Sequence, residues 1–303
     1  MAYVAGMDGG GTKTALTIAD ERGEAVHRFV SGPINFNGQD EASIRRSFEE
    51  MFAEIGRVCG GLENCARICI GAAGVSNPAV VSRMTELVQS CGYEGELIIA
   101  GDHETALRGA HESPHGMILI AGTGSICFGR NEAGAEHRAG GCGYLIDDEG
   151  SGYSIGRELL SAVVRANDGR LPPTVITSLV YERLGIDSVR QVIGFAHAKT
   201  TNKKDIAALA PLLSEACALG DAAAMAIVRK SAEALRELVV PVAERLNLQG
   251  GNLALAGSVL LRNDEVRAEL LSLLKRDFPD MTVYPAKQEA SWGAVLMAMA
   301  QTA

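Results

Sequence analysis

Residues 7–14 read Met7-Asp8-Gly9-Gly10-Gly11-Thr12-Lys13-Thr14, and they stand between two short apolar runs at 3–5 and 15–19. An apolar run on each side of a glycine-rich turn predicts a β-hairpin. Three consecutive glycines cost conformational entropy on folding, so packing alone does not explain them. They leave several backbone N–H groups able to point at one anion, and the lysine and threonines add a cation and two hydroxyls. We interpret residues 9–14 as a phosphate-binding loop.

Asp8 stands at the mouth of this predicted turn. A carboxylate there is suited to hold Mg²⁺ through water, which makes Asp8 the candidate metal ligand. The alternative is a plain glycine-rich hairpin turn with a solvated lysine. The stretch is not a Walker A loop, because a strand follows it where a helix should begin. A dinucleotide-binding fingerprint is excluded for the same reason.

Composition and charge bound the class of protein. The chain has 303 residues, enough for two domains, and its net charge of −9 disfavours a broad nucleic-acid surface. No apolar run reaches the length of a membrane span, and no secretory leader pattern stands at the N-terminus. The seven cysteines include no C-x-x-C pair, which favours small buried residues in a reducing compartment. We expect a cytoplasmic protein without nucleic-acid or membrane partners.

The first half continues with the alternation typical of an α/β fold. Apolar residues recur at helical spacing over 40–60, a buried strand is expected at 67–74, a helix from Pro78, and a strand at 96–100. Asp102 follows this last strand almost at once. Ligands bind beyond the carboxyl ends of parallel strands, which favours a catalytic role for Asp102. The alternative is that Asp102 only caps the next helix.

The second half opens as the first did. A strand expected at 116–121 leads into the polar turn Gly122-Thr123-Gly124-Ser125, and a returning strand follows at 126–129. The repeat lies in the order of elements, since residue identity between the halves is slight. Two glycine-and-hydroxyl hairpins, one in each half, predict a cleft whose two sides hold a polyphosphate.

Residues 140–158 form the most unusual segment of the chain. Three adjacent acids, Asp147, Asp148 and Glu149, stand among glycines and lead into a predicted helix. Such a segment is poor as a structural element, which favours a ligand or a metal. The alternative is a solvated acidic loop at a helix start, where negative charge interacts favourably with the helix dipole.

Later elements are mostly helical. The pattern predicts helices at 157–168, 173–185, 188–198, 203–219 and 221–246, then a strand that ends at Gly257-Ser258 and could face a nucleoside. A last helix is expected over 290–300, where Gly293 would allow a close crossing with another helix. Asn35, in the loop-like stretch 31–38, could bind a polyhydroxylated ligand, although residue chemistry alone favours a simple turn.

These motifs together carry a resemblance. The DGGGTKT and GTGS loops, the Asp at a strand end between them and the late AGS turn resemble the actin/hexokinase/Hsp70 ATPase superfamily. Residues 140–158 resemble the BadF/BadG/BcrA/BcrD-type ATPase family, which includes N-acetylglucosamine kinases. The resemblance implies an α/β fold of two RNase H-like domains with a cleft between them. The N-terminal domain would span 1–115 and be joined by a helix at 289–303, and the C-terminal domain would span 116–288 with a helical insert.

The resemblance also implies roles for particular residues. The protein would be an ATP- and Mg²⁺-dependent kinase for an amino sugar, expected as a homodimer. Residues 9–14 and 122–125 would hold the phosphates, and Gly257 with Ser258 would lie against the adenosine. Asp102 matches the catalytic base, which would take a proton as the sugar hydroxyl attacks the γ-phosphoryl group. The sugar would lie against Asn35, Asp102 and Asp148, with Gly141 and Cys142 at the family's GGWG position, so that the resemblance overrides the turn reading of Asn35.

Three departures concern the sugar pocket. Ile126 stands where related kinases have asparagine after GTGS, Cys142 replaces a tryptophan, and Asp147 replaces the usual glycine. N-acetylglucosamine, glucosamine and N-acetylmuramic acid therefore all stay open as substrates, and the local acids would favour a free amine.

Two other functions are compatible with the superfamily. An ATP-driven activator of acyl-CoA dehydratases or reductases would hold an iron–sulfur cluster, and the scattered cysteines disfavour it. A nucleotide-binding regulator without turnover is disfavoured by Asp102 together with both phosphate loops.

Overall fold

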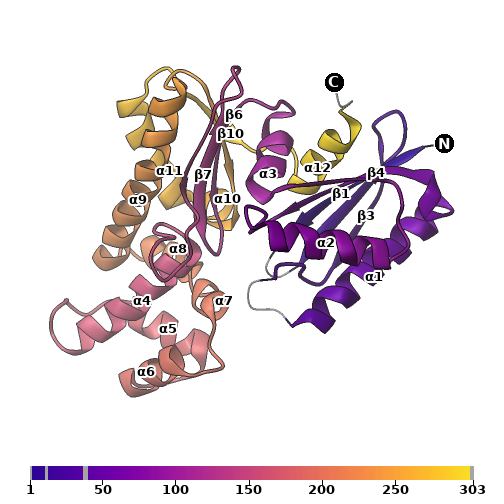
Figure 1. The fold of residues 1–303 in the computed structure, drawn as a ribbon. Coiled ribbons are helices and arrows are strands. Elements are labelled where there is room, and N and C mark those ends of the chain that lie inside the picture. The colour runs from indigo at the N-terminus through magenta and orange to yellow at the C-terminus, as the bar shows by residue number, and fades with distance from the viewer. Residues whose placement is uncertain (1, 11–12, 37–39, 301–303) are drawn as a thin grey trace. The chain divides into compact units, whose positions relative to one another are not determined.

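The chain divides into two compact units in the computed structural model, which describes residues 2–10, 13–36 and 40–300. Unit 1 combines Met1–His115 with Ala286–Ala303, and unit 2 is Gly116–Pro285. Each unit contains one five-stranded sheet flanked by helices (Figure 1). The α/β class predicted from the alternation of elements is confirmed.

The sheet of unit 1 joins a hairpin meander to two parallel strands. β1 (Tyr3–Gly9), β2 (Thr14–Ala19) and β3 (Ala25–Ser31) pair antiparallel, while β4 (Cys65–Ala72) and β5 (Glu96–Gly101) extend the sheet in parallel, in the order β3-β2-β1-β4-β5. The register pairs Asp8 with Gly71 and Gly71 with Ala100. The carboxyl ends of β1, β4 and β5 therefore meet at one edge of the sheet.

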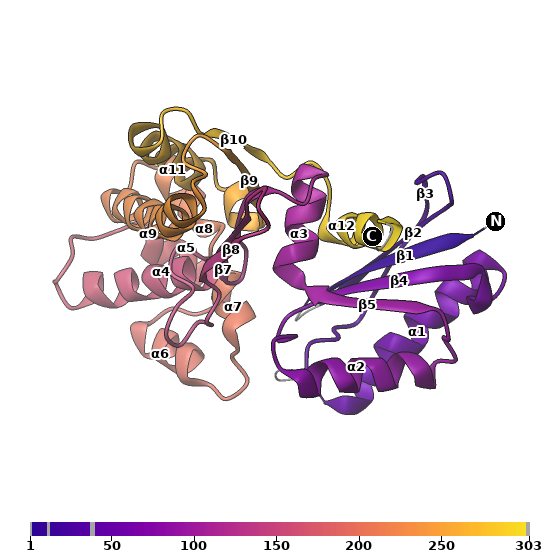
Figure 2. The same ribbon diagram turned by 45° about the horizontal axis from the view of Figure 1, so that its top comes forward.

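Helices cover both faces of this sheet (Figure 2). α1 (Glu41–Cys59) and α2 (Pro78–Ser90) lie on one face, with the short 3₁₀ helix η1 (Leu62–Asn64) after α1. The predicted apolar stripe of α1 is buried against the strands. α3 (Asp102–His111) and α12 (Ala290–Met299) cover the other face. The predicted close crossing is confirmed, because a Cβ on Gly293 would lie 1.9 Å from the Thr105 carbonyl oxygen.

Unit 2 repeats the strand scheme of unit 1. β6 (Gly116–Ala121), β7 (Ser125–Arg130) and β8 (Glu136–Gly140) pair antiparallel, and β9 (Asn252–Ala256) and β10 (Thr282–Pro285) continue in parallel, in the order β10-β9-β6-β7-β8. The register pairs Ile120 with Ala256. The loops that begin at Gly122 and Gly257 consequently start side by side.

Most of unit 2 is helical. One large core joins α9 (Ala222–Leu246), α11 (Asp264–Asp277) and the sheet to the helices α4 (Gly152–Asn167), α5 (Ile176–Leu184), α6 (Val189–His197) and α8 (Leu212–Ala218). The short helices α7 (Lys203–Ala207) and α10 (Ser258–Arg262) complete the unit. No helix in the described ranges is long and apolar enough to cross a membrane.

Two predicted helices have different bounds in the structure. The single helix expected at 203–219 is divided into α7 and α8 around residues 208–211, where Pro211 has no N–H to continue the helical hydrogen bonding. α4 begins at Gly152, five residues before the predicted start at 157. The hydroxyl oxygen of Ser151 caps α4 by accepting a hydrogen bond from the Ser154 N–H, a signal hidden within the acidic loop.

Candidate active site

Three carboxylates gather at the carboxyl edge of the unit 1 sheet. Asp8 lies on β1, Asp102 begins α3, and Glu289 is the N-cap residue of α12. Burial raises the pKa of Asp8 to about 6, and the carboxylates of Asp102 and Glu289 add to the rise, while Lys13 opposes it. The edge is thus a place of mutual repulsion between acids, which a bound cation would relieve.

Asp102 is not used as a helix cap. The N-cap of α3 is Gly101, whose N–H donates to Oε1 of Glu104, so the capping alternative for Asp102 is wrong. The Asp102 side chain is 46% exposed. Its Oδ1 accepts a hydrogen bond from the His103 N–H at 2.9 Å and lies 3.3 Å from His103 Nδ1. The carboxylate is therefore oriented by its neighbour and still accessible to a substrate hydroxyl.

The first glycine loop is described in part. Gly9 ends β1, Gly10 follows it, Lys13 is exposed, and Gly11 and Thr12 lie outside the described residues. The N–H of Gly10 donates within the turn, to the carbonyl oxygens of Asp8 and Lys13. Thr14 is buried, and its hydroxyl donates to the Gly32 carbonyl oxygen at 2.8 Å. That bond ties the hairpin to the segment after β3, in which Asn35 lies half-buried.

The second glycine loop is fastened to the acidic segment. The Ser125 N–H donates to Oδ1 of Asp148 at 3.1 Å, and the Ser125 hydroxyl donates to the Glu149 carbonyl oxygen at 2.7 Å. The Gly152 N–H donates to the Gly122 carbonyl oxygen, also at 2.7 Å. These bonds hold both ends of the loop 122–125 in one arrangement.

Asp148 is the central member of this connection. It is 5% exposed and has a left-handed backbone, with a φ of 66°. Burial raises the pKa of its carboxyl group, while the hydrogen bond from Ser125 and the charge of Lys203 act in the opposite direction. The family resemblance predicts Asp148 as a sugar contact, which stays a prediction, and the structure shows Asp148 hydrogen-bonded to Ser125 of the second glycine loop.

The rest of the acidic segment is also hydrogen-bonded internally. Oδ2 of Asp147 accepts from the Cys142 N–H at 2.9 Å. The Glu149 carboxylate accepts from the Ser154 hydroxyl and from Arg157. Cys142 itself is exposed, and the Gly141 N–H donates to the Ser125 carbonyl oxygen. The alternative of a merely solvated acidic loop does not describe this folded segment.

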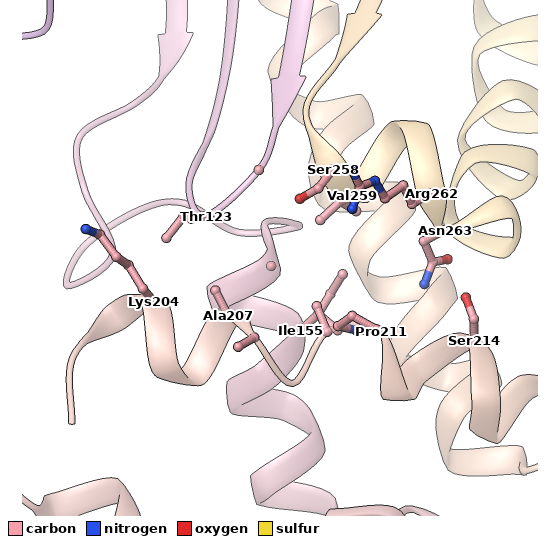
Figure 3. A pocket seen from close by; sticks show the side chains of 14 residues that line it. Thr123, Ile155, Lys204, Ala207, Pro211, Ser214, Ser258, Val259, Arg262 and Asn263 are labelled. Atoms are coloured by element: carbon pink, nitrogen blue, oxygen red, sulfur yellow. The ribbon is translucent and has the colours of Figure 1, made fainter. Parts of the chain in front are cut away.

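A cavity of about 600 Å³ lies within unit 2. It brings together three residues that the sequence predicted for nucleotide binding, namely Gly122, Thr123 and Ser258. The lining also includes Gly152, Ile155, Lys204, Ala207, Ala208, Ala210, Pro211, Ser214, Val259, Arg262 and Asn263. Figure 3 shows Thr123 and Lys204 at one end of the cavity and Ser214 and Asn263 at the other. Thr123 of the second glycine loop therefore lies at the opposite end of the cavity from Ser214 of α8.

Gly257 connects β9 to α10 at a point close to the end of β6. Its φ is 88°, and a Cβ there would lie 2.3 Å from the Ala121 carbonyl oxygen. Only glycine therefore lets the chain leave β9 so close to the end of β6.

The sequence prediction missed three residues that line the cavity, namely Lys204, Arg262 and Asn263. Arg262 and Asn263 follow Ser258 by about one helical turn and could have been found from that spacing, whereas nothing in the sequence pointed from the helical segment to Lys204.

Comparison with known proteins identifies the family of the chain. The model of the BadF/BadG/BcrA/BcrD ATPase family matches residues 5–298, and the chain belongs to that family. It is 33% identical to an N-acetylmuramic acid/N-acetylglucosamine kinase of Clostridium acetobutylicum, over 99% of both chains. It is 30% identical to an N-acetyl-D-glucosamine kinase of Dictyostelium discoideum, over 97% of both. A solved structure from Porphyromonas gingivalis shares the fold, with a TM-score of 0.76 at 23% identity over 99% of both chains.

Proposed function

We propose that this protein transfers the γ-phosphoryl group of ATP to a hydroxyl of an amino sugar, with N-acetylglucosamine, glucosamine and N-acetylmuramic acid as the candidate acceptors. The observation that carries the proposal is the 33% identity, over 99% of both chains, to a kinase named for two of these sugars. Each unit adds support by itself: unit 1 has an accessible carboxylate at a strand end, and unit 2 has a cavity of about 600 Å³.

Asp102 is the proposed catalytic base. The sugar hydroxyl would give its proton to the Asp102 carboxylate while its oxygen attacks the γ-phosphorus. The bond from that phosphorus to the β–γ bridging oxygen breaks, and ADP leaves. Little covalent work falls to the protein in such a transfer, so positioning and charge neutralisation dominate. The exposure of Asp102, together with its hydrogen bond from His103, suits a base that must reach a substrate oxygen.

The nucleotide would be held by both glycine loops. Residues 9–14 and 122–125 are the proposed phosphate contacts, and Gly257 with Ser258 the proposed adenosine contacts. The supporting observation is that Gly122, Thr123 and Ser258, distant in sequence, line one cavity. The hydrogen bonds of Ser125 with Asp148 and Glu149, and of Gly152 with Gly122, hold the second loop in one arrangement, which suits amides that bind phosphate without reorganisation.

A Mg²⁺ ion would accompany ATP near Asp8. Asp8 offers a hard oxygen ligand, and a cation would relieve the burial and the repulsion by Asp102 and Glu289 that raise its pKa to about 6. Within residues 2–10, 13–36 and 40–300, no group of three or more His, Cys, Asp or Glu side chains is arranged to hold a metal. The proposal therefore assigns most ligands of the ion to phosphate oxygens and water. When bound, the ion would neutralise charge on the phosphates.

The acceptor sugar is assigned to Asn35, Asp102, Gly141, Cys142 and Asp148. Asn35 and Asp102 belong to unit 1, and the other three belong to unit 2. The support here is the family resemblance together with the exposure of Cys142 and Asp102. We also propose a cytoplasmic location, from the scattered cysteines, and a homodimer, from the family resemblance. Sedimentation analysis of the purified protein would check the dimer.

An ADP-release assay across the three amino sugars tests the function. We expect ADP formation that depends on sugar and on Mg²⁺, with a phosphorylated sugar detected by mass spectrometry. ATP turnover that is unchanged by every sugar would instead favour the energising ATPase function. Absence of any turnover would contradict both and would leave the regulator as the explanation.

A further inference from the structure

Each acid of the segment 147–149 accepts a hydrogen bond from a neighbouring group of the protein. Asp147 accepts from the Cys142 N–H, Asp148 from the Ser125 N–H, and Glu149 from Ser154 and Arg157. Each acid is thus engaged within unit 2. The acids therefore do not by themselves favour a free amine on the sugar, because each already accepts a hydrogen bond and the Arg157 guanidinium pairs with Glu149.

A cation stands next to the same segment. Lys203, the first residue of α7, is exposed, and its ammonium lies 6.0 Å from the centre of the Tyr144 ring. The Tyr144 ring in turn meets Tyr153 edge to face, with ring centres 4.9 Å apart. An aromatic face attracts an ammonium group, and a ring braced by a second ring offers a fixed platform.

Lys203 also acts on a residue assigned to the sugar. Its charge lowers the pKa of Asp148, against the rise caused by burial. Tyr144 lies two residues from Cys142, which stands where related kinases have a tryptophan. Lys203 therefore acts electrostatically on Asp148, which is assigned to the acceptor site, and lies over the ring of Tyr144, two residues after Cys142.

We propose that Lys203, positioned by Tyr144, binds a carboxylate substituent of the acceptor, so that the enzyme prefers amino sugars that carry an acid over neutral ones. This inference depends on the proposed kinase function. A lactyl ether such as that of N-acetylmuramic acid has the required chemistry. An exposed lysine that already lies over a ring has fewer conformations to lose when it forms a charge-assisted hydrogen bond.

Replacing Lys203 with glutamine tests this assignment through a ratio of two substrates. We expect kcat/KM for N-acetylmuramic acid to fall roughly tenfold to hundredfold, the loss of one charge-assisted hydrogen bond. The value for N-acetylglucosamine should change by less than about threefold, because a neutral sugar makes no such bond. Lys203→Arg should keep most of the preference. Lys199→Gln removes the same charge from a nearby exposed position and serves as the control.

The outcomes separate this inference from the function on which it depends. Equal losses on both sugars in Lys203→Gln would assign the lysine a general electrostatic role and overturn the inference alone. The same holds if the wild-type enzyme phosphorylates the neutral sugar and never the acidic one. Failure of the wild-type enzyme to phosphorylate either sugar would overturn the proposed function, and the inference with it.

Discussion

The two units have sheets of the same topology, but the acids near their glycine loops are in opposite environments. In each, an antiparallel meander is extended by two parallel strands, and a glycine loop joins the first two strands. At the unit 1 edge, the carboxylate of Asp8 is repelled by those of Asp102 and Glu289. The corresponding loop in unit 2 has its acid, Asp148, buried and hydrogen-bonded to Ser125.

This difference separates two tasks that one scaffold can perform. Carboxylates that repel each other gain from a cation or from a proton, which suits the edge where a metal and a base are needed. A carboxylate that already accepts a hydrogen bond from a loop makes that loop more rigid. This suits a loop that must bind the same phosphate group in every cycle. Asp8 and Asp102 are thus expected to act as reactive acids, and Asp148 as a structural one.

The sharpest test is Asp102→Asn. If the unit 1 edge supplies the base, turnover should fall about 10²–10⁴-fold, the usual contribution of a positioned base. Nucleotide affinity should stay within about twofold, because the amide keeps the size of the carboxylate and the nucleotide cavity lies in unit 2. The coupled ADP assay and a nucleotide titration measure the two quantities. Asp280→Asn, at an exposed position, is the control. Retained turnover would remove Asp102 from the reaction.

The extent to which sequence revealed this site differs between its parts. The glycine loops, Asp102 and the Gly257-Ser258 turn were found because each stands at a strand end, and strand ends are local features of the chain. Glu289 was missed, since its approach to Asp8 depends on the return of the C-terminal segment to unit 1. Lys203 and Lys204 were missed because helical spacing says nothing about which helix faces a cavity or an aromatic ring.

Asp148 shows a different limit of the sequence. Its pattern marked it as unusual, yet the bond from the Ser125 N–H joins residues 23 positions apart and cannot be read from either segment. The resemblance pointed to a sugar contact, while the geometry adds a bond that fixes the phosphate loop. Both roles can belong to one carboxylate, because each oxygen accepts more than one hydrogen bond.

Asp148→Ala tests the structural acid of unit 2. Removal of the acceptor leaves the buried Ser125 N–H without its bond, and alanine tolerates the left-handed backbone less well than aspartate. We expect unit 2 to lose about 2–3 kcal/mol of unfolding free energy in chemical denaturation. Asp148→Asn keeps an acceptor oxygen and should lose clearly less. Equal losses in the two variants would show that the Ser125 bond is not what Asp148 contributes.

The raised pKa of Asp8 makes the folding stability of unit 1 depend on pH, with a defined sign. Its pKa in the folded chain is about 6, above the ordinary value of 3.8, so the folded state holds the proton more tightly than the unfolded state. The resulting stability is full below pH 4 and is lost as the pH rises towards 6. Without Mg²⁺, the loss should be on the order of 3 kcal/mol in the wild type and largely absent in Asp8→Asn. Parallel pH–stability curves for the two proteins would contradict the prediction.

Thr123→Val probes the loop that Asp148 holds. Valine keeps the shape of threonine and removes only the hydroxyl, and Thr123 lines the cavity assigned to the nucleotide. One lost neutral hydrogen bond should raise the ATP dissociation constant about threefold to tenfold. Thr123→Ser retains the hydroxyl and should bind ATP nearly as the wild type does. Because Asp148 and Glu149 fix Ser125 at the other end of the loop, the loop itself should stay in place in Thr123→Val. An unchanged dissociation constant would then mean that the unit 2 loop is rigid for some reason other than holding phosphate.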